Sequence, residues 1–320
     1  MSELAVIGAG AWGTALAIHA ARAGQQVSLW VRDADRARDI ARSRENPRLP
    51  GFVLPDGVEV TATLPTARLT LLAVPLQHLR EVAGRMNGAE AFVVCAKGVE
   101  QGTLCLPLEI LAQLHPGVPA CVLTGPNFAH EIAAGLPAAS VVAGGDATLR
   151  QTVMAALKTS DFRLYGNEDA IGAQIGGAAK NVIAIAAGAS DGARLGENAR
   201  AALITRGLAE LTRMAVAMGG QAATVSGLSG LGDLLLTCTG GRSRNYNVGL
   251  GLGQGLPIAD VLARHSSVAE GVSTAPALLA LAERHGIDLP ICRAVASLVA
   301  GRSVLRSEIA GLLARRARDE

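Results

Sequence analysis

The chain has 320 residues, of which 50% are hydrophobic and 18% are charged, and its formal net charge is +2. This balance excludes a strongly basic nucleic-acid binder, and an aromatic content of 2% leaves few side chains on which bases could stack. A chain of this length and apolar content can form two domains, each with its own core.

The hydropathy pattern and the cysteines indicate where in the cell the protein is located. The long uncharged stretches, such as residues 214–232, are interrupted by Gly, Ser, Thr or Gln, so they do not form about 20 continuous apolar residues. A strand-like run begins at Leu4 and leads into a Gly-rich loop, so we expect no signal peptide. The five cysteines include no CxxC pair, which favours reduced thiols. We therefore expect a cytoplasmic protein with no integral membrane segment.

The first half of the sequence alternates short apolar runs with segments of helical periodicity. The expected strands are residues 4–7, 27–31, 69–74, 91–95, 120–123, 139–143 and 162–165. The expected helices are residues 14–23, 34–44, 77–86 and 106–114. Near-continuous apolar strands that alternate with helices predict a parallel sheet covered on both faces. We expect an α/β, doubly wound sheet of the Rossmann type over residues 1–166, forming a dinucleotide-binding domain.

The second half loses this alternation and becomes rich in Ala and Leu at helical spacing. The expected helices are residues 170–189, 199–218, 258–263, 275–284 and 307–317. This pattern predicts an all-α carboxy-terminal domain over residues 167–320. The motifs and the family resemblance described below imply that it binds the substrate and carries the catalytic residue.

A Gly-x-Gly-x-x-Gly pattern lies directly after the first expected strand and opens a helix. Its glycines are Gly8, Gly10 and Gly13. In dinucleotide-binding folds the first permits a tight turn, the second lets the backbone approach a pyrophosphate, and the third allows the helix to pack closely on the strand. The helix N-terminus then faces the anion. The pattern alone would be weak, but this strand–loop–helix context predicts a dinucleotide site.

The end of the second strand bears on the choice of cofactor. Arg32 stands at its tip, where a guanidinium can bind the 2′-phosphate of NADPH, and Arg36 lies one turn into the next helix and could assist. Asp33 has two readings, as an acceptor for the free 2′-hydroxyl of NADH or as the cap of the following helix. We expect NADPH to be preferred and NADH to be used as well.

Lysine is rare in this chain and occurs only at positions 97, 158 and 180. Lys97 follows an expected strand, at the edge where open α/β sheets bind ligands. Lys180 and Asn181 interrupt an apolar helix rich in Gly and Ala. A buried ammonium needs a ligand, a counter-charge or a shifted pKa, and a lysine pKa lowered to about 7–8 would suit proton transfer. The alternative is a lysine that extends to the solvent along the helix surface.

Three further segments carry polar groups that suit an anionic substrate. The turn Gly125-Pro126-Asn127 follows a strand and opens a helix, so its backbone N–H groups could hold an anion or a cofactor amide. Asp233 closes a Gly-rich run. Ser243, Arg244 and Asn245 form a cluster of donors suited to a phosphate, although such a triplet is also common on protein surfaces.

Taken together, these segments resemble the bacterial NAD(P)-dependent glycerol-3-phosphate dehydrogenases. The matching segments are GAGAWGTALA from Gly8, AKG from Ala96, TGPNFAHE from Thr124, QIGGAAKNVIAIAAG from Gln174, NARAALITRGLAE from Asn198, GLGDLLLTCT from Gly230, SRN from Ser243 and VAEG from Val268. They run in order along nearly the whole chain. The resemblance implies the reversible reduction of dihydroxyacetone phosphate to sn-glycerol 3-phosphate with NADPH or NADH, which would supply phospholipid synthesis.

The resemblance also implies roles for individual residues. Lys180 would donate the proton in reduction and accept it in oxidation, Lys97 would bind the substrate and polarise its carbonyl, and Asp233 would hold Lys180 or a substrate hydroxyl. The other implied substrate-binding residues are Gly125, Asn127, Asn181, Thr237, Ser243, Arg244 and Asn245. The implied cofactor-binding residues are Gly8, Gly10, Ala11, Trp12, Gly13, Arg32, Asp33, Lys97, Ala129, Arg244, Val268 and Glu270. No metal is expected.

The chain departs from the family pattern at Asn127, where the family usually has Ser or Thr. Position 33 varies in the family, so Asp33 leaves the coenzyme preference open. Two other functions are also open. A Lys-dependent 3-hydroxyacid dehydrogenase would bind a substrate carboxylate at Arg244, and a catalytically inactive protein would bind NADPH as a regulator. The presence of both Lys97 and Lys180 counts against the regulator. The expected partner is a small-molecule substrate and not a nucleic acid, and a homodimer is left open.

Overall fold

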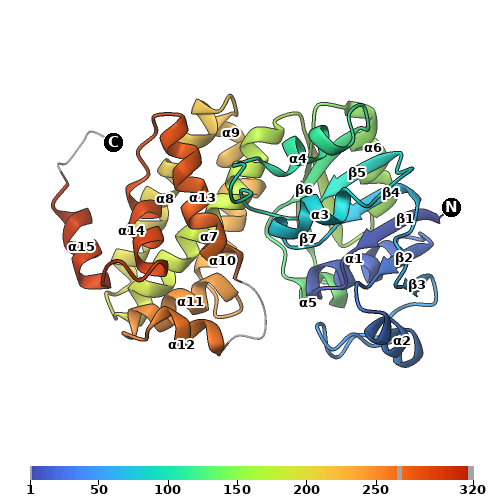
Figure 1. Ribbon diagram of the computed structural model, residues 1–320, viewed down its shortest axis with the longest axis horizontal. Coiled ribbons are helices and arrows are strands. Elements are labelled where there is room, and N and C mark those ends of the chain that lie inside the picture. The colour runs from blue at the N-terminus through green and yellow to red at the C-terminus, as the bar shows by residue number, and fades with distance from the viewer. Residues whose placement is uncertain (1, 265–268, 316–320) are drawn as a thin grey trace. The chain divides into compact units, whose positions relative to one another are not determined.

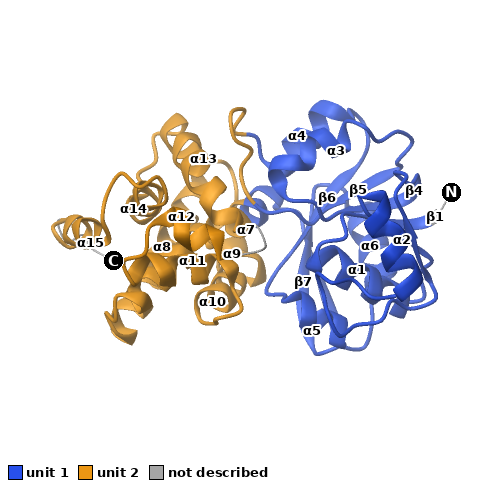
Figure 2. Cartoon of the chain, turned by 60° about the horizontal axis from the view of Figure 1, so that its bottom comes forward, with its two compact units in different colours: residues 1–97, 105–174 blue, residues 98–104, 175–320 orange. Residues whose placement is uncertain are grey.

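The computed structural model describes residues 2–264 and 269–315. The chain divides into two compact units (Figure 2). The first comprises residues 1–97 and 105–174, and the second comprises residues 98–104 and 175–320. Within the second unit, the short segment 98–104 is tied to the helices, because the side-chain amide of Gln101 donates to the carbonyl oxygen of Ser273 at 3.2 Å. The domain limits expected from the sequence, 1–166 and 167–320, remain a prediction.

The first unit is built on an eight-stranded sheet in the order β3-β2-β1-β4-β5-β6-β7-β8 (Figure 1). Its strands are β1 (Ser2–Ile7), β2 (Val27–Trp30), β3 (Val58–Thr61), β4 (Ala67–Leu72), β5 (Ala91–Val94), β6 (Ala120–Thr124), β7 (Ala138–Ala143) and β8 (Phe162–Asn167). All neighbouring strands pair in parallel except β6 and β7, which are antiparallel. The first six have the order of a doubly wound nucleotide-binding sheet, whose switch point lies between β1 and β4.

The prediction of an α/β sheet followed by a helical region is confirmed. The expectation of a parallel sheet is wrong at β7, because the connection after β6 holds only a short helix and returns the chain along the neighbouring strand. Strand β3 was not predicted from the sequence. This edge strand buries Val58 while its other residues are partly or fully exposed, so it lacks the continuous apolar run of a central strand.

Helices on both faces cover this sheet. They are α1 (Ala11–Arg22), α2 (Ala34–Ser43), α3 (Leu79–Ala83), α4 (Pro107–Leu114), α5 (Ala129–Ala134) and α6 (Ala147–Leu157). Right-handed crossovers that move in opposite directions along the sheet place α1 and α3 on opposite faces. The predicted helix 77–86 is a 3₁₀ turn (Leu76–His78) followed by α3. The helix expected after the turn Gly125-Pro126-Asn127 is α5, whereas α6 was not predicted.

A buried histidine ties α1 to the end of α6. The Nε2 atom of His19 lies 2.7 Å from the carbonyl oxygen of Leu157, and its ring meets Phe162 edge-on. Burial lowers the pKa of His19 below its ordinary value, and the hydrogen bond to Leu157 opposes this shift. The histidine therefore serves as a neutral link between two layers of the unit.

The second unit is helical apart from its turns. Its elements are α7 (Ala170–Gly192, which begins in the first unit), α8 (Glu197–Ala217), α9 (Ala222–Val225), a π-helical turn (Leu228–Gly232), α10 (Asp233–Cys238), α11 (Arg244–Gly253), α12 (Ile258–Ala263), α13 (Glu270–Arg284), α14 (Pro290–Val299) and α15 (Leu305–Leu313). Helices α9, α10, α11 and α14 were not predicted. The predicted helix 307–317 overlaps α15, and its last two residues lie outside the described part of the chain.

Helix α7 forms the centre of this unit. Among the described helices of at least 18 residues, it is the one long and apolar enough to cross a membrane, yet 83% of its apolar window is buried inside the protein. Such burial is typical of the core helix of a folded domain, so its composition is only weak support for a membrane segment. The homodimer that the sequence left open stays open.

Candidate active site

The Gly-rich loop between β1 and α1 is shaped by close backbone contacts. Gly8 has a φ of +111°, a conformation that L side chains rarely adopt. A Cβ atom on Gly13 would lie 1.9 Å from the carbonyl oxygen of Gly8, so the first turn of α1 packs directly on the loop. Gly10 differs, because a Cβ atom there would meet no atom within 4 Å. Its backbone faces open space, as the approach of a pyrophosphate requires.

Two side chains from distant segments hold the carbonyl oxygen of Ala9 in this loop. The Nη2 atom of Arg36 donates to it at 2.5 Å, and the side-chain amide of Asn46 donates at 3.1 Å. Asn46 is fully buried and also donates to the hydroxyl of Thr14 at 2.6 Å. Burial lowers the pKa of Arg36, with Arg48 adding to the shift. Arg36, which the sequence indicates as an aid to phosphate binding, therefore shapes the loop. Asn46 does the same, and no sequence pattern indicates it.

The end of β2 separates the roles of its two charged residues. The carboxylate of Asp33 accepts from the backbone N–H of Arg36 at 2.7 Å, which makes it the N-cap of α2. Arg32 is exposed beside it. The capping interpretation of Asp33 thus has a structural basis, while its contact with a cofactor remains a prediction.

The carboxyl ends of β5 and β6 bring three of the expected residues together. The Nζ atom of Lys97, which follows β5, donates to the carbonyl oxygen of Gly125 at 3.3 Å. Gly125 has a φ of +145°, and a Cβ atom there would lie 3.1 Å from the Cα atom of Ser140. The side-chain nitrogen of Asn127 donates to the Ser140 hydroxyl at 2.5 Å. Parallel neighbours end at the same edge of a sheet, which explains why Lys97 and Gly125 meet.

Two buried polar atoms at this edge lack a hydrogen-bond partner among the described residues. They are the Oδ1 atom of Asn127 and the Oγ1 atom of Thr124. Buried polar groups are usually satisfied, so such atoms at the ligand-binding edge of a sheet fit a site that receives a polar molecule. The open backbone at Gly10 in the Gly-rich loop fits the pyrophosphate of a dinucleotide, and these two atoms are free to bind a further polar group.

In the second unit, Lys180 lies in a buried cluster of polar side chains. Its ammonium forms an ion pair with the Oδ1 atom of Asp233 and donates to the hydroxyl of Thr237 at 3.0 Å. The three residues are 8%, 1% and 5% exposed, which rejects the alternative of a lysine that reaches the solvent. The Thr237 hydroxyl in turn donates to the carbonyl oxygen of Asp233 at 2.6 Å. The structure thus supplies the counter-charge that a buried ammonium needs.

A close backbone contact at Gly176 positions the ion pair of Lys180 and Asp233. A Cβ atom on Gly176 would lie 2.6 Å from the carbonyl oxygen of Ser229, so α7 touches the π-helical turn at this point. Lys180 stands one turn after Gly176, and Asp233 stands about one turn after Ser229. The charged side chains therefore project from adjacent turns, next to an irregular helical segment of a kind that often marks functional sites.

The residue of α7 that follows Lys180, Asn181, belongs to a second network of hydrogen bonds. The side-chain nitrogen of Asn245 donates to the Oδ1 atom of Asn181 at 2.9 Å, and its oxygen accepts from the backbone N–H of Gly271 at 2.9 Å. Ser243 caps α11 by accepting from the N–H of Tyr246 at 3.2 Å, and Arg244 is exposed at the first position of that helix. The expected phosphate-binding residues thus lie beside the turn that carries Lys180 and Asn181.

The remaining expected cofactor residues lie at helix starts. Ala11 and Trp12 begin α1, Ala129 begins α5 and Glu270 begins α13; all four are half-buried. Val268 lies outside the described residues. Their contacts with a cofactor remain predictions.

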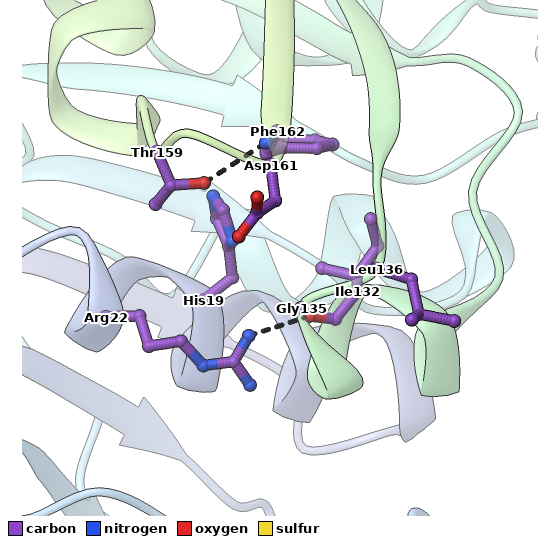
Figure 3. Close-up of a pocket in the computed structure, with 8 residues that line it drawn as sticks. All are labelled: His19, Arg22, Ile132, Gly135, Leu136, Thr159, Asp161 and Phe162. Carbon is purple, nitrogen blue, oxygen red and sulfur yellow. Dashed lines mark hydrogen bonds between the residues drawn. The ribbon is translucent and has the colours of Figure 1, made fainter.

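Other features of the described residues give no competing site. A pocket of about 30 Å³ in the first unit contains none of the expected site residues (Figure 3). It is lined by His19, Arg22, Ile132, Gly135, Leu136, Thr159, Asp161 and Phe162. No group of three or more His, Cys, Asp or Glu side chains among the described residues could hold a metal ion. Burial raises the pKa of Cys238 to about 12, so this thiol near Lys180 stays protonated.

Comparison with known proteins identifies the family. The amino-terminal sequence model of the NAD-dependent glycerol-3-phosphate dehydrogenases matches residues 3–150, and the carboxy-terminal model matches residues 169–309. A glycerol-3-phosphate dehydrogenase (NAD(P)+) from Acidiphilium cryptum is 56% identical over 99% of this chain and 98% of its own length. The chain belongs to the NAD-dependent glycerol-3-phosphate dehydrogenase family. A relative of the same name from Gluconobacter oxydans is 54% identical over 93% of this chain and 92% of its own length.

A solved structure of this family has the same fold. The glycerol-3-phosphate dehydrogenase of Coxiella burnetii superimposes with a TM-score of 0.94 at 36% identity, over 98% of this chain and 99% of that one. The predicted resemblance to the glycerol-3-phosphate dehydrogenase family is therefore confirmed. As a member, the protein is an NAD(P)-dependent oxidoreductase with a Rossmann-type amino-terminal region and a helical carboxy-terminal region.

Proposed function

We propose that this member of the glycerol-3-phosphate dehydrogenase family reduces dihydroxyacetone phosphate to sn-glycerol 3-phosphate, reversibly, with NADPH preferred to NADH. The observation that carries the proposal is the buried cluster of Lys180, Asp233 and Thr237. One turn of α7 presents both Lys180 and Asn181, and Asn181 is bonded to Asn245 at the start of α11. A phosphorylated ketone requires this combination of a proton donor and nearby anion-binding groups.

NADPH, when bound, would supply the hydride for C2 of the substrate. Negative charge then develops on the C2 oxygen, and the ammonium of Lys180 stabilises it and transfers the proton. Asp233 and Thr237 keep the ammonium at a fixed point, so little reorganisation is needed during the reaction. Lys97, held by the carbonyl oxygen of Gly125, would help to bind and polarise the carbonyl, a role implied by the family resemblance.

Residues at the start of α11 would bind the phosphate. Arg244 can offer two parallel N–H groups, and Ser243 and Asn245 add donors at a capped helix N-terminus. Binding energy from this remote group would hold C2 in line for hydride addition. In the first unit, the open backbone at Gly10 would receive the pyrophosphate and Arg32 would select NADPH through its 2′-phosphate.

We place the reaction in the cytoplasm, where its product would serve phospholipid synthesis. The burial of α7 within the protein supports a protein that acts on a small molecule without a membrane segment.

A substrate and cofactor panel tests the proposal. The purified protein is mixed with NADPH or NADH and with dihydroxyacetone phosphate, unphosphorylated dihydroxyacetone or a small 3-oxo acid, and the loss of reduced nicotinamide absorbance is followed. We expect rapid oxidation with dihydroxyacetone phosphate, a higher kcat/KM with NADPH, and slow or no reaction with the other two substrates. Faster turnover of the 3-oxo acid would establish the alternative dehydrogenase, and no turnover of any substrate would indicate a cofactor-binding regulator.

A further inference from the structure

A carboxylate that the proposed reaction does not use joins three helices of the second unit. Asp191, near the end of α7, accepts from the hydroxyl of Tyr246 on α11 at 2.5 Å and from the Nη1 atom of Arg200 on α8 at 2.5 Å. The side chain of Asp191 is only 16% exposed, and that of Arg200 is 27% exposed. The hydrogen bond to Asp191 raises the pKa of Arg200. Burial, followed by the same carboxylate, raises the pKa of Tyr246.

The contact between α7 and α11 is unusually close along its whole length. A Cβ atom on Gly188 would lie 1.9 Å from the carbonyl oxygen of Tyr246, and one on Gly249 would lie 1.9 Å from that of Ile185. Gly192 and Gly253 repeat the arrangement one turn later, with corresponding distances of 2.3 Å to the carbonyl oxygens of Leu250 and Ala189. Backbones in direct contact leave little freedom to slide, so any remaining freedom of α11 lies in rotation and in fraying of its first turn.

Two side-chain contacts limit that freedom. On one side, Asn245 is bonded to Asn181, and on the other, Tyr246 is bonded to Asp191. Tyr246 is the third residue of α11 and donates its backbone N–H to the capping hydroxyl of Ser243. The bond to Asp191 therefore restrains the same turn that carries Ser243, Arg244 and Asn245. Arg200 holds the Asp191 carboxylate from the third helix.

We propose that Asp191 and Tyr246 are positioning residues that preorganise the first turn of α11 for the substrate phosphate, without touching the substrate. This inference rests on the proposed function, because it assigns phosphate binding to residues 243–245. An anion site that is already ordered pays a smaller entropy cost when the anion binds. Without this preorganisation, binding of the phosphate should weaken more than the chemical step slows.

The test compares steady-state kinetics of the parent with those of Tyr246→Phe, Asp191→Ala and the double variant. We expect KM for dihydroxyacetone phosphate to rise about five- to tenfold in each single variant, the effect of about one hydrogen bond, with kcat changed less than about twofold. The inhibition constant of inorganic phosphate should rise by the same factor, while KM for NADPH should stay constant. Because the two groups share one contact, the double variant should be no worse than the more affected single variant.

Glu197→Gln is the matched control. Glu197 is the second acidic partner of Arg200, at 4.0 Å, but its side chain is 93% exposed. Its removal should leave both KM values unchanged. Tyr246→Phe deletes a single oxygen atom and carries the test if Asp191→Ala folds poorly.

Unchanged KM for dihydroxyacetone phosphate in both single variants would overturn the inference. A parallel loss of kcat and of both cofactor and substrate affinity would also overturn it, because that pattern indicates a general structural role. A parent protein that does not reduce dihydroxyacetone phosphate would instead contradict the proposed function, so the two failures are distinguishable.

Discussion

The two units of the molecule hold their candidate sites by different physical means. In the first, the shape of the main chain is decisive: Gly13 packs on the carbonyl oxygen of Gly8, and two side chains fix the carbonyl oxygen of Ala9. In the second, side chains from separate helices meet, as Lys180 does with Asp233. We therefore expect substitutions at the site in the first unit to change the shape of the loop and the affinity for the cofactor. Substitutions at the site in the second unit should lower kcat and leave cofactor binding intact.

The largest effect should follow from removing the amine of Lys180. Lys180→Ala should lower kcat by about 10³-fold or more, since it removes both the proton donor and the charge beside the C2 oxygen. Lys180→Arg keeps a positive partner for Asp233 but cannot give up a proton, so it should lose a similar factor. Steady-state assays measure kcat, and fluorescence titration with NADPH checks that binding is retained.

Lys158→Ala is the control for this prediction. It removes the third lysine of the chain, which is exposed, and should leave kcat unchanged. If Lys180→Arg retained more than about a tenth of kcat, Lys180 would not be the essential proton donor, because another group would then have to transfer the proton.

The next largest effects should come from Gly13 and Gly10, which have different roles in the loop. Gly13 allows close packing, and Gly10 leaves room for the cofactor. Gly13→Ala would place a methyl group 1.9 Å from the Gly8 carbonyl oxygen, so it should destabilise the fold by about 3 kcal/mol. Gly10→Ala meets no atom within 4 Å and should leave the urea unfolding midpoint unchanged, but its methyl group would obstruct a pyrophosphate and raise the NADPH Kd at least about tenfold. Equal stability and equal NADPH affinity in both variants would show that main-chain shape does not govern this loop.

A smaller effect concerns Arg32, whose expected role depends on its side chain. Arg32→Ala should raise KM for NADPH about tenfold and KM for NADH less than about twofold, because only NADPH carries the 2′-phosphate. Arg38, which pairs with Asp35 on the exposed side of α2, provides the control Arg38→Ala. Equal changes in both KM values for Arg32→Ala would remove Arg32 as the selector.

The smallest predicted effect is a dependence of stability on pH in the first unit. Burial lowers the folded-state pKa of His19, whereas the unfolded chain binds a proton near pH 6.5. As the pH falls below 6.5, the unfolded state gains a proton that the folded state does not, so stability is lost. The free energy of unfolding should therefore fall between pH 7.5 and 5.5, and it should fall more in the parent than in His19→Gln, as measured by urea unfolding at both pH values. An identical loss in parent and variant would show that His19 does not contribute.

The features that could be predicted from the sequence are those dictated locally. The strand before Gly8, the spacing of the glycines and a lysine inside an apolar helix each leave a pattern within a few residues. The residues that complete each site are distant in the chain. Asn46 lies 37 residues from Ala9, and Asp233 lies 53 residues from Lys180. A buried ammonium at Lys180 requires a counter-charge, but only the family resemblance indicated that Asp233 provides it.

Other differences follow from side chains with two available partners. A guanidinium at position 36 could have faced a phosphate, but the carbonyl oxygen of Ala9 accepts from it. Asp33 was open between a ribose contact and a helix cap, and it accepts from the N–H of Arg36. Helix α11 was not predicted because three glycines, which weaken helix propensity, lie within the segment. Two of them, Gly249 and Gly253, are required by its contact with α7.

The most direct test of this account is a structure of the protein with NADPH and glycerol 3-phosphate bound. It should place the Nζ atom of Lys180 within hydrogen-bond distance of the C2 oxygen, with the phosphate held by Ser243, Arg244 and Asn245. A phosphate bound elsewhere, or a C2 oxygen that contacts a different proton donor while Lys180 stays apart, would contradict it.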